Sequence, residues 1–174
     1  MSPSENSLKN ALNLNGVDSC GGHKVFLVDS QNRCSAIAWH SGKLKRVARS
    51  TLAAETMALS DGIEETLYLR KIVQFMIGGV IPVLAVTDNK SLHQSVNSTH
   101  SVQEKRLRID ISAIKEMVES DNVSLVWMPS EAQLADCLTK RGASSHSLMN
   151  TLGSGVLPEL CTPSQILLHL LYVK

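Results

Sequence analysis

The sequence predicts an α/β protein in which helices flank one mixed sheet, and three observations support this fold class. A hairpin comes first, because the apolar segments 24–29 and 34–39 are separated by a short polar turn. A long helix follows over about 51–77. Two short apolar runs, 83–88 and 123–128, then alternate with amphipathic helical patterns. Strands and helices in this order are typical of a layered α/β domain with a single core.

The composition is that of an ordinary globular protein. The chain of 174 residues is long enough for one domain with its own core, and 43% hydrophobic with 19% charged residues exclude wholesale disorder. The formal net charge of +1 excludes a strongly basic nucleic-acid coat protein. Any affinity for phosphate groups therefore depends on local basic segments.

The cysteines and the apolar segments predict an intracellular protein of the cytoplasm or the nucleus. The four cysteines have no Cys-x-x-Cys spacing, and the sequence opens without a signal-peptide pattern. Reduced thiols are therefore expected, rather than a disulfide framework or a zinc site. No apolar stretch approaches the ~20 residues that cross a membrane, so no membrane contact is expected.

Three segments are expected along the chain. Residues 1–20 are polar, which predicts an irregular N-terminal segment. Residues 21–153 form the α/β domain, and residues 154–174 form a C-terminal extension. In the extension, Thr162-Pro163-Ser164-Gln165 has the pattern of a capping box with proline at the first helical position, which predicts a short apolar helix over 166–173. A strand in the same place remains an alternative, as does a role of this tail in covering an exposed surface.

The helix over 51–77 has an apolar face with an acidic residue beside it. Ser50 or Thr51 caps its start, and Gly78-Gly79 ends it. Glu55 falls just off the edge of the apolar arc, so we expect it at the surface of the sheet and not at the centre of the core. The arc consists of Leu52, Leu59, Ile63 and Leu67.

Two further acidic residues lie at the edges of apolar elements. Asp88 ends the strand over 83–87, and Asp136 lies in a short helix over about 133–140. Together with Glu55 they supply the hard oxygen ligands that Mg²⁺ prefers, which is the chemistry of a divalent-metal nuclease. Two other roles remain open, because Asp88 can cap the next helix and Glu55 can interact with the helix dipole.

Five sequence blocks occur in a characteristic order: Ile37-Ala38-Trp39-His40-Ser41, residues 50–60, Val86-Thr87-Asp88-Asn89, residues 106–111 and residues 134–140. Together they resemble the ribonuclease H domain at the end of copia-type LTR retrotransposon Pol polyproteins. The resemblance implies a ribonuclease H-like mixed sheet flanked by helices. It also implies a two-metal site with Mg²⁺, or with Mn²⁺ instead, that cleaves the RNA strand of an RNA–DNA hybrid.

The resemblance further assigns roles to individual residues. By position, Glu55, Asp88 and Asp136 match the family's metal ligands and catalytic carboxylates. A reverse transcriptase domain in a longer polyprotein becomes an expected partner. The family's first strand, however, carries an Asp about a dozen residues before the hairpin, where this chain has Asn10-Ala11. The Asn amide is a poor substitute for a carboxylate that bridges two ions.

No other acidic residue near the N-terminus matches the position of the family's first-strand Asp. Glu5 has no strand pattern around it, and Asp18 lies too close to the hairpin. The first strand is therefore expected to be missing or degenerate, with impaired activity as the consequence.

Two basic segments, 43–49 and 105–108, are the candidate nucleic-acid contacts. Such runs are usually solvated loops. In the implied fold, however, they lie near the edge of the site, where phosphate contact is expected. Trp39 and Trp127 lie on predicted strands and are expected in the core, with base stacking as the alternative. The candidate contact residues are Lys43, Lys45, Arg46, Arg49, Asn89, Lys105, Arg106 and Arg108.

The expected function is endonucleolytic cleavage of RNA in RNA–DNA hybrids, a hydrolase activity of retroelement origin. Two alternatives remain. A catalytically inactive remnant would bind nucleic acid or a protein partner without cleaving it. A fragment without its central strand would fold only when a partner supplies one, and would otherwise aggregate through its exposed edge.

Overall fold

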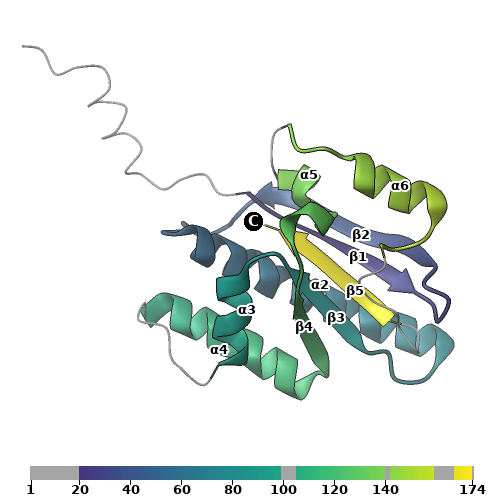
Figure 1. The fold of residues 1–174 in the computed structure, drawn as a ribbon. Coiled ribbons are helices and arrows are strands. Elements are labelled where there is room, and N and C mark those ends of the chain that lie inside the picture. Colours follow the sequence, from purple (N-terminus) through teal and green to yellow (C-terminus); the bar gives the residue numbers. More distant parts are fainter. Residues whose placement is uncertain (1–19, 99–104, 140–141, 159–166, 174) are drawn as a thin grey trace, which may run out of the picture.

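The computed structural model describes residues 20–98, 105–139, 142–158 and 167–173. They contain a five-stranded sheet with the strand order β2-β1-β5-β3-β4. β1 is antiparallel to both of its neighbours, whereas β3 is parallel to β5 and to β4. This is the mixed α/β architecture that the sequence predicts, and it is compatible with a ribonuclease H-like fold (Figure 1). The strands are β1 (Cys20–Val28), β2 (Cys34–Lys43), β3 (Val83–Thr87), β4 (Val123–Trp127) and β5 (Leu167–Val173).

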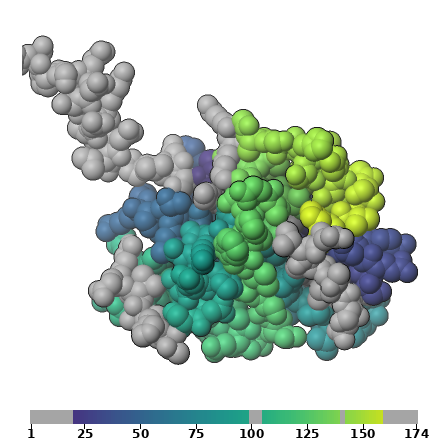
Figure 2. All heavy atoms as spheres, in the orientation of Figure 1, coloured from purple at the N-terminus to yellow at the C-terminus, as the bar shows by residue number. Residues whose placement is uncertain are grey.

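The β1–β2 hairpin is longer than predicted, and its turn is held by one aspartate. Asp29 Oδ1 accepts backbone hydrogen bonds of 2.9 Å from both Gln31 and Arg33. Such Asx turns offer the backbone a local partner where the strand ladder ends. The turn packs beside the segment around Gly155 (Figure 2), where the N–H of Cys34 donates to the Gly155 carbonyl at 2.7 Å.

The long helix α2 (Thr51–Ile77) forms as predicted. The Ser50 hydroxyl oxygen accepts a 3.1 Å hydrogen bond from the N–H of Ala53, and Gly78 ends the helix with a φ of 74° that favours glycine. Within the described residues, neither α2 nor any other helix is long and apolar enough to span a membrane. Of the predicted arc, Leu59, Ile63 and Leu67 are buried and Leu52 is half-buried.

Helices α3 (Lys90–Asn97) and α4 (Lys105–Ser120) pack on the same face of the sheet as α2 (Figure 1). Asn89 caps α3, because its Oδ1 accepts a 2.9 Å hydrogen bond from the N–H of Leu92. Asp88 is therefore not the cap of this helix. Residues 105–108 form the first turn of α4, so the alternative of a solvated loop is wrong for this segment. The core on this face includes Val25, Leu59, Ile63, Ala85, Leu92 and Ile114.

The opposite face of the sheet is covered by short helices (Figure 1). They are η1 (Ser130–Ala132), α5 (Asp136–Thr139) and α6 (His146–Ser154). Because side chains alternate along a strand, Val25 of β1 faces α2 and Phe26 faces α5 and α6. The smaller core on this face consists of Phe26, Val28, Val86, Met128, Leu134, Leu148 and Leu157.

The apolar tail of the chain is the central strand of the sheet. Leu167–Val173 forms β5, between β1 and β3, so the prediction of a short helix there is wrong. The predicted cap is a local pattern, whereas the hydrogen bonds of β5 come from strands far away in the sequence. The chain therefore supplies a central strand from its C-terminal segment. Glu5, Asn10 and Asp18 lie outside the described residues.

Candidate active site

The register of the strands brings β1, β3 and β5 together at one end of the sheet. β3 pairs Val86 with Leu171 of the parallel strand β5, and β5 pairs Val173 with Gly22 of the antiparallel strand β1. Asp88 directly follows β3, so it lies level with Val173 and with the start of β1. We call this edge, where β3 and β5 end and β1 begins, the carboxyl end of the sheet.

The first turns of α2 bring Glu55 to the carboxyl end. Gly21 of β1 allows a close approach, since a Cβ there would lie 3.2 Å from the Cβ of Ala58. Glu55 precedes Ala58 by about one turn and is only 1% exposed. The expectation that Glu55 avoids the centre of the core is therefore wrong. Because α2 packs against both the sheet and α4, its buried surface is wider than the apolar arc.

Asp88 is half-buried and is held by Trp127 at the end of β4 and by Ser130 of η1. Its Oδ2 accepts a 2.8 Å hydrogen bond from the hydroxyl of Ser130, and its backbone carbonyl accepts one of 2.9 Å from Trp127 Nε1. Ser130 was missed by sequence reasoning, because only the parallel pairing of β3 with β4 brings the residues after both strands together. Among the described residues, none donates a hydrogen bond to Oδ1, the other carboxylate oxygen of Asp88.

Helix α5 brings Asp136 to the same end from the opposite face. A Cβ on Gly22 would lie 2.8 Å from Thr139 Cγ2, so glycine permits this approach of α5 to β1. The Ser41 hydroxyl of β2 donates a 2.6 Å hydrogen bond to the Leu138 carbonyl and fixes α5 over the sheet. Asp136 is the first residue of α5 and is half-buried.

The carboxyl end thus receives Glu55 from one face, Asp136 from the other and Asp88 from between them. Among the residues that the structure describes, no three His, Cys, Asp or Glu side chains are arranged to hold a metal ion. The donor chemistry itself suits Mg²⁺, because all three groups are carboxylates. The central strand Leu167–Val173 contains no acidic residue, so β5 adds no fourth carboxylate.

The two basic segments lie together beside the start of α2. Arg46 Nη1 donates a 3.0 Å hydrogen bond to Asp110 Oδ1 of α4, which joins segment 43–49 to the helix that begins with 105–108. Arg49 and Arg106 line one small cavity between them. Asn89, by contrast, uses its side-chain oxygen as the cap of α3. The exposed cationic residues are Lys43, Lys45, Arg46, Arg49, Lys105, Arg106 and Arg108.

Neither tryptophan lies in the core, which corrects the prediction for both. Trp39 is 70% exposed on β2, and Trp127 is 40% exposed at the end of β4. Both strands are edges of the sheet, and the pattern of a strand does not say whether a neighbour covers it. The indole of Trp127 is engaged, since its N–H bonds Asp88 and Lys90 Nζ lies 5.9 Å from its ring centroid.

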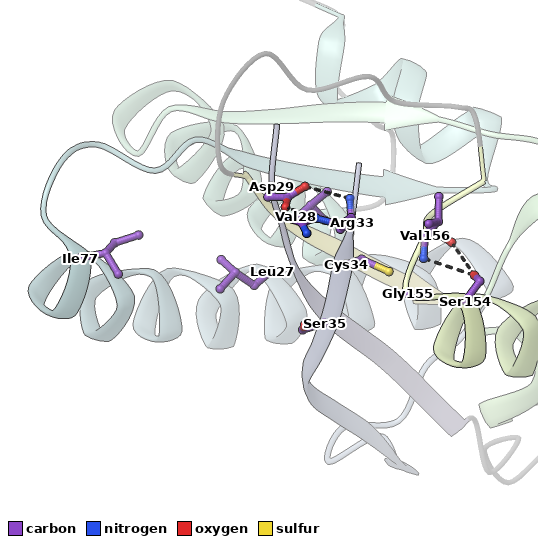
Figure 3. A pocket seen from close by; sticks show the side chains of 10 residues that line it. All are labelled: Leu27, Val28, Asp29, Arg33, Cys34, Ser35, Ile77, Ser154, Gly155 and Val156. Atoms are coloured by element: carbon purple, nitrogen blue, oxygen red, sulfur yellow. Dashed lines mark hydrogen bonds and ion pairs between the residues drawn. The ribbon is translucent and has the colours of Figure 1, made fainter. Parts of the chain in front are cut away.

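A cavity of about 610 Å³ lies at the other end of β1 (Figure 3). There the Arg33 guanidinium donates to Asp29 Oδ2 at 2.7 Å. The pKa of Asp29 is lowered, first by the backbone N–H of Arg33, and burial raises the pKa of the Cys34 thiol. A strand rises ~3.3 Å per residue, so this cavity is ~20 Å from Gly22. None of the predicted site residues lines it.

The fold and the site define a mixed α/β protein with acidic residues at one sheet end and basic segments beside it. No family model matches the chain. It is 28% identical over 106 residues to the retrovirus-related Pol polyprotein from transposon TNT 1-94 of Nicotiana tabacum. The match covers 60% of this chain and 8% of the polyprotein, so the chain corresponds to a small part of that relative. The similarity supports an origin in a retroelement Pol polyprotein.

Proposed function

We propose that the chain is a retroelement-derived ribonuclease H-like domain that cleaves RNA in RNA–DNA hybrids in a metal-dependent endonucleolytic reaction. The observation that carries this proposal is the meeting of α2, β3 and α5 at the carboxyl end, where each brings one acidic residue. The similarity to a retroelement Pol polyprotein supports the retroelement origin in this proposal. A reverse transcriptase domain of such a polyprotein is the proposed partner.

Glu55, Asp88 and Asp136 are the residues that would hold Mg²⁺, or Mn²⁺ in its place. When bound, a pair of such ions activates water and stabilises the leaving oxygen of an in-line displacement. The contribution of this chain is to orient the carboxylates. The Ser130 hydroxyl holds one oxygen of Asp88, and burial of Glu55 strengthens the attraction between its carboxylate and a cation.

The exposed basic segments 43–49 and 105–108 are the proposed contacts to the phosphate backbone of the hybrid. They adjoin the start of α2, which also carries Glu55, so a strand bound there runs toward the carboxyl end. Contacts of this kind position a nucleic acid without reading its sequence. Recognition of the RNA strand then depends on helix shape and on 2′-hydroxyl groups.

The test is a cleavage assay on a labelled RNA–DNA hybrid with Mg²⁺ or Mn²⁺. Asp88→Asn and Glu55→Gln are expected to lower the rate by about 100-fold or more, beyond the usual effect of residues around a metal site. Glu64→Gln is the matched control, because Glu64 is an exposed acid on the same helix. Circular dichroism confirms that each variant is folded. An Asp88→Asn variant that cleaves as fast as the wild type would refute the proposal.

A second candidate is a domain that binds nucleic acid without cleaving it. The absence of any acidic residue in the sequence of β5 favours this candidate. The same assay separates the two functions when hybrid binding is measured beside cleavage. A folded protein that binds the hybrid in a salt-dependent way, cleaves nothing with either ion and binds equally well as Asp88→Asn has this second function.

A further inference from the structure

The exposed indole of Trp39 lies over the same face of the sheet as α5. Trp39 of β2 pairs directly with Lys24 of β1, and the next pair toward the carboxyl end on that face is Ser41 with Gly22. Residues two apart on a strand point to the same side. Ser41 bonds the Leu138 carbonyl of α5, which identifies the side. Trp39 and Lys24 therefore lie next to each other on the α5 face.

Lys24 is a buried cation on this face. It is 6% exposed, and it makes no hydrogen bond or ion pair with any residue in the described part of the chain. Burial lowers its pKa, and the neighbouring Cys137 opposes only part of that shift. Since no described residue forms an ion pair with this ammonium, an anion that approaches it from solvent meets no competing carboxylate among the described residues.

The indole ring of Trp39 is accessible to a ligand. Its side chain is 70% exposed, and no ring or cation contact involves it among the described residues. An exposed indole is a platform on which an unpaired base of any identity stacks. A base on Trp39 would bring its own phosphate toward the strand that carries Lys24, because directly opposite residues have Cβ atoms only ~5 Å apart.

Resting on the proposed function, we infer that Trp39 and Lys24 form a subsite for an unpaired segment of nucleic acid next to the hybrid. Three strand spacings of ~4.8 Å separate β2 from β3, so this subsite is ~15 Å from Asp88. One nucleic acid therefore reaches both places. The preferred substrate is a hybrid with a single-stranded overhang, and a fully paired hybrid binds less tightly.

Two hybrids test the inference, one blunt and one extended by six unpaired deoxynucleotides. Binding is measured by fluorescence anisotropy in EDTA, so that no cleavage occurs. The overhang is expected to raise the affinity of the wild type by about 10-fold, which is typical of stacking one base on an aromatic ring. Trp39→Leu is expected to abolish this gain and to leave binding of the blunt hybrid unchanged. Tyr68→Leu is the control, because Tyr68 is an aromatic residue that is 65% exposed on α2, away from the proposed subsite.

Lys24→Met supplies an independent readout. Loss of one phosphate contact is expected to reduce the slope of log affinity against log salt by about 0.7 for the overhang. An overhang that adds no affinity, or a gain that survives Trp39→Leu, would overturn the subsite while hybrid cleavage still stands. Conversely, a protein that binds only the overhang through Trp39, and neither binds nor cleaves the blunt hybrid, would overturn the proposed function and keep the subsite.

Discussion

The two faces of the sheet differ in the size of their apolar cores and in the polar and exposed groups that they carry. The face under α2, α3 and α4 has a continuous core of 18 buried apolar residues among those described, against 7 on the face under α5 and α6. The second face also has a buried lysine, an exposed tryptophan and a helix of only four residues. Among the described residues, the α2 face therefore has the larger core, while the α5 face has the Trp39–Lys24 pair of the inferred subsite.

Two consecutive glycines of β1 serve the two faces separately. Gly21 lies against α2 and its preceding loop, and Gly22 lies against α5. Both close approaches occur at the carboxyl end, where α2, β3 and α5 carry Glu55, Asp88 and Asp136. The faces therefore differ in their cores but share the one end at which the proposed chemistry occurs.

The largest expected effect compares the two cores directly. Ile63→Ala removes a fully buried side chain from the α2 face, and we expect it to lower the free energy of unfolding by about 3–5 kcal/mol. Leu148→Ala on the α5 face is expected to lower it by about 2–3 kcal/mol, because the smaller core can relax around the cavity. Urea unfolding measures both values. A larger loss for Leu148→Ala would reverse the comparison.

A smaller effect is expected at the glycine pair. Gly22→Ala places a methyl group 2.8 Å from Thr139 Cγ2 and 3.2 Å from the backbone oxygen of His40, and we expect a loss of about 1–3 kcal/mol. Gly21→Ala is expected to be milder, since its nearest contact is the movable end of Leu44. Gly22→Ala should also slow hybrid cleavage in the folded protein, because it displaces α5. Equal stability and equal cleavage for both variants would contradict this difference between the faces.

The smallest expected effect has the opposite sign. Lys24→Met replaces the buried ammonium by an apolar group of similar length, and we expect a gain in unfolding free energy of about 1 kcal/mol at neutral pH. The same variant is expected to weaken binding of the overhang. Higher stability combined with weaker binding is the result expected when a residue serves ligand binding at a cost in folding stability.

The pH dependence of stability checks the cause of that gain. Burial lowers the pKa of Lys24 below its usual 10.5, so folded Lys24 loses its proton at a lower pH than the unfolded chain does. Between those two pKa values the unfolded state binds more protons, and the stability of the wild type rises with pH. Thermal unfolding from pH 7 to pH 10.5 should show this rise in the wild type and a weaker one in Lys24→Met. Identical slopes would exclude Lys24 as the cause.

Much of the fold could be predicted, because it depends on patterns that neighbouring residues make. The Ser50 cap, the helix to Ile77, the strand before Asp88 and the hairpin all follow from local periodicity and capping chemistry. The positions of Glu55, Asp88 and Asp136 at the edges of elements follow from the same patterns. Whether these three acids bind metal stays a prediction.

The errors fall where the outcome depends on distant partners. The tail Leu167–Val173 is apolar throughout, so its sequence has no period that separates helix from strand. The strand pattern around Trp39 predicts a core position, yet Trp39 is exposed on the edge strand β2. Glu55 is more buried than its place on the helix suggested, since α4 and the sheet both cover that side of α2.

The sequence by itself determined the helices, the hairpin, the short strands and the acidic residues at their ends, because propensity, capping and alternation act between residues close in the chain. Only the tertiary structure decided that the C-terminal segment is the central strand, that Ser130 holds Asp88, and that Lys24 lies beside Trp39. Strand pairing joins segments that are far apart in sequence, and no local pattern specifies which strand a segment will meet.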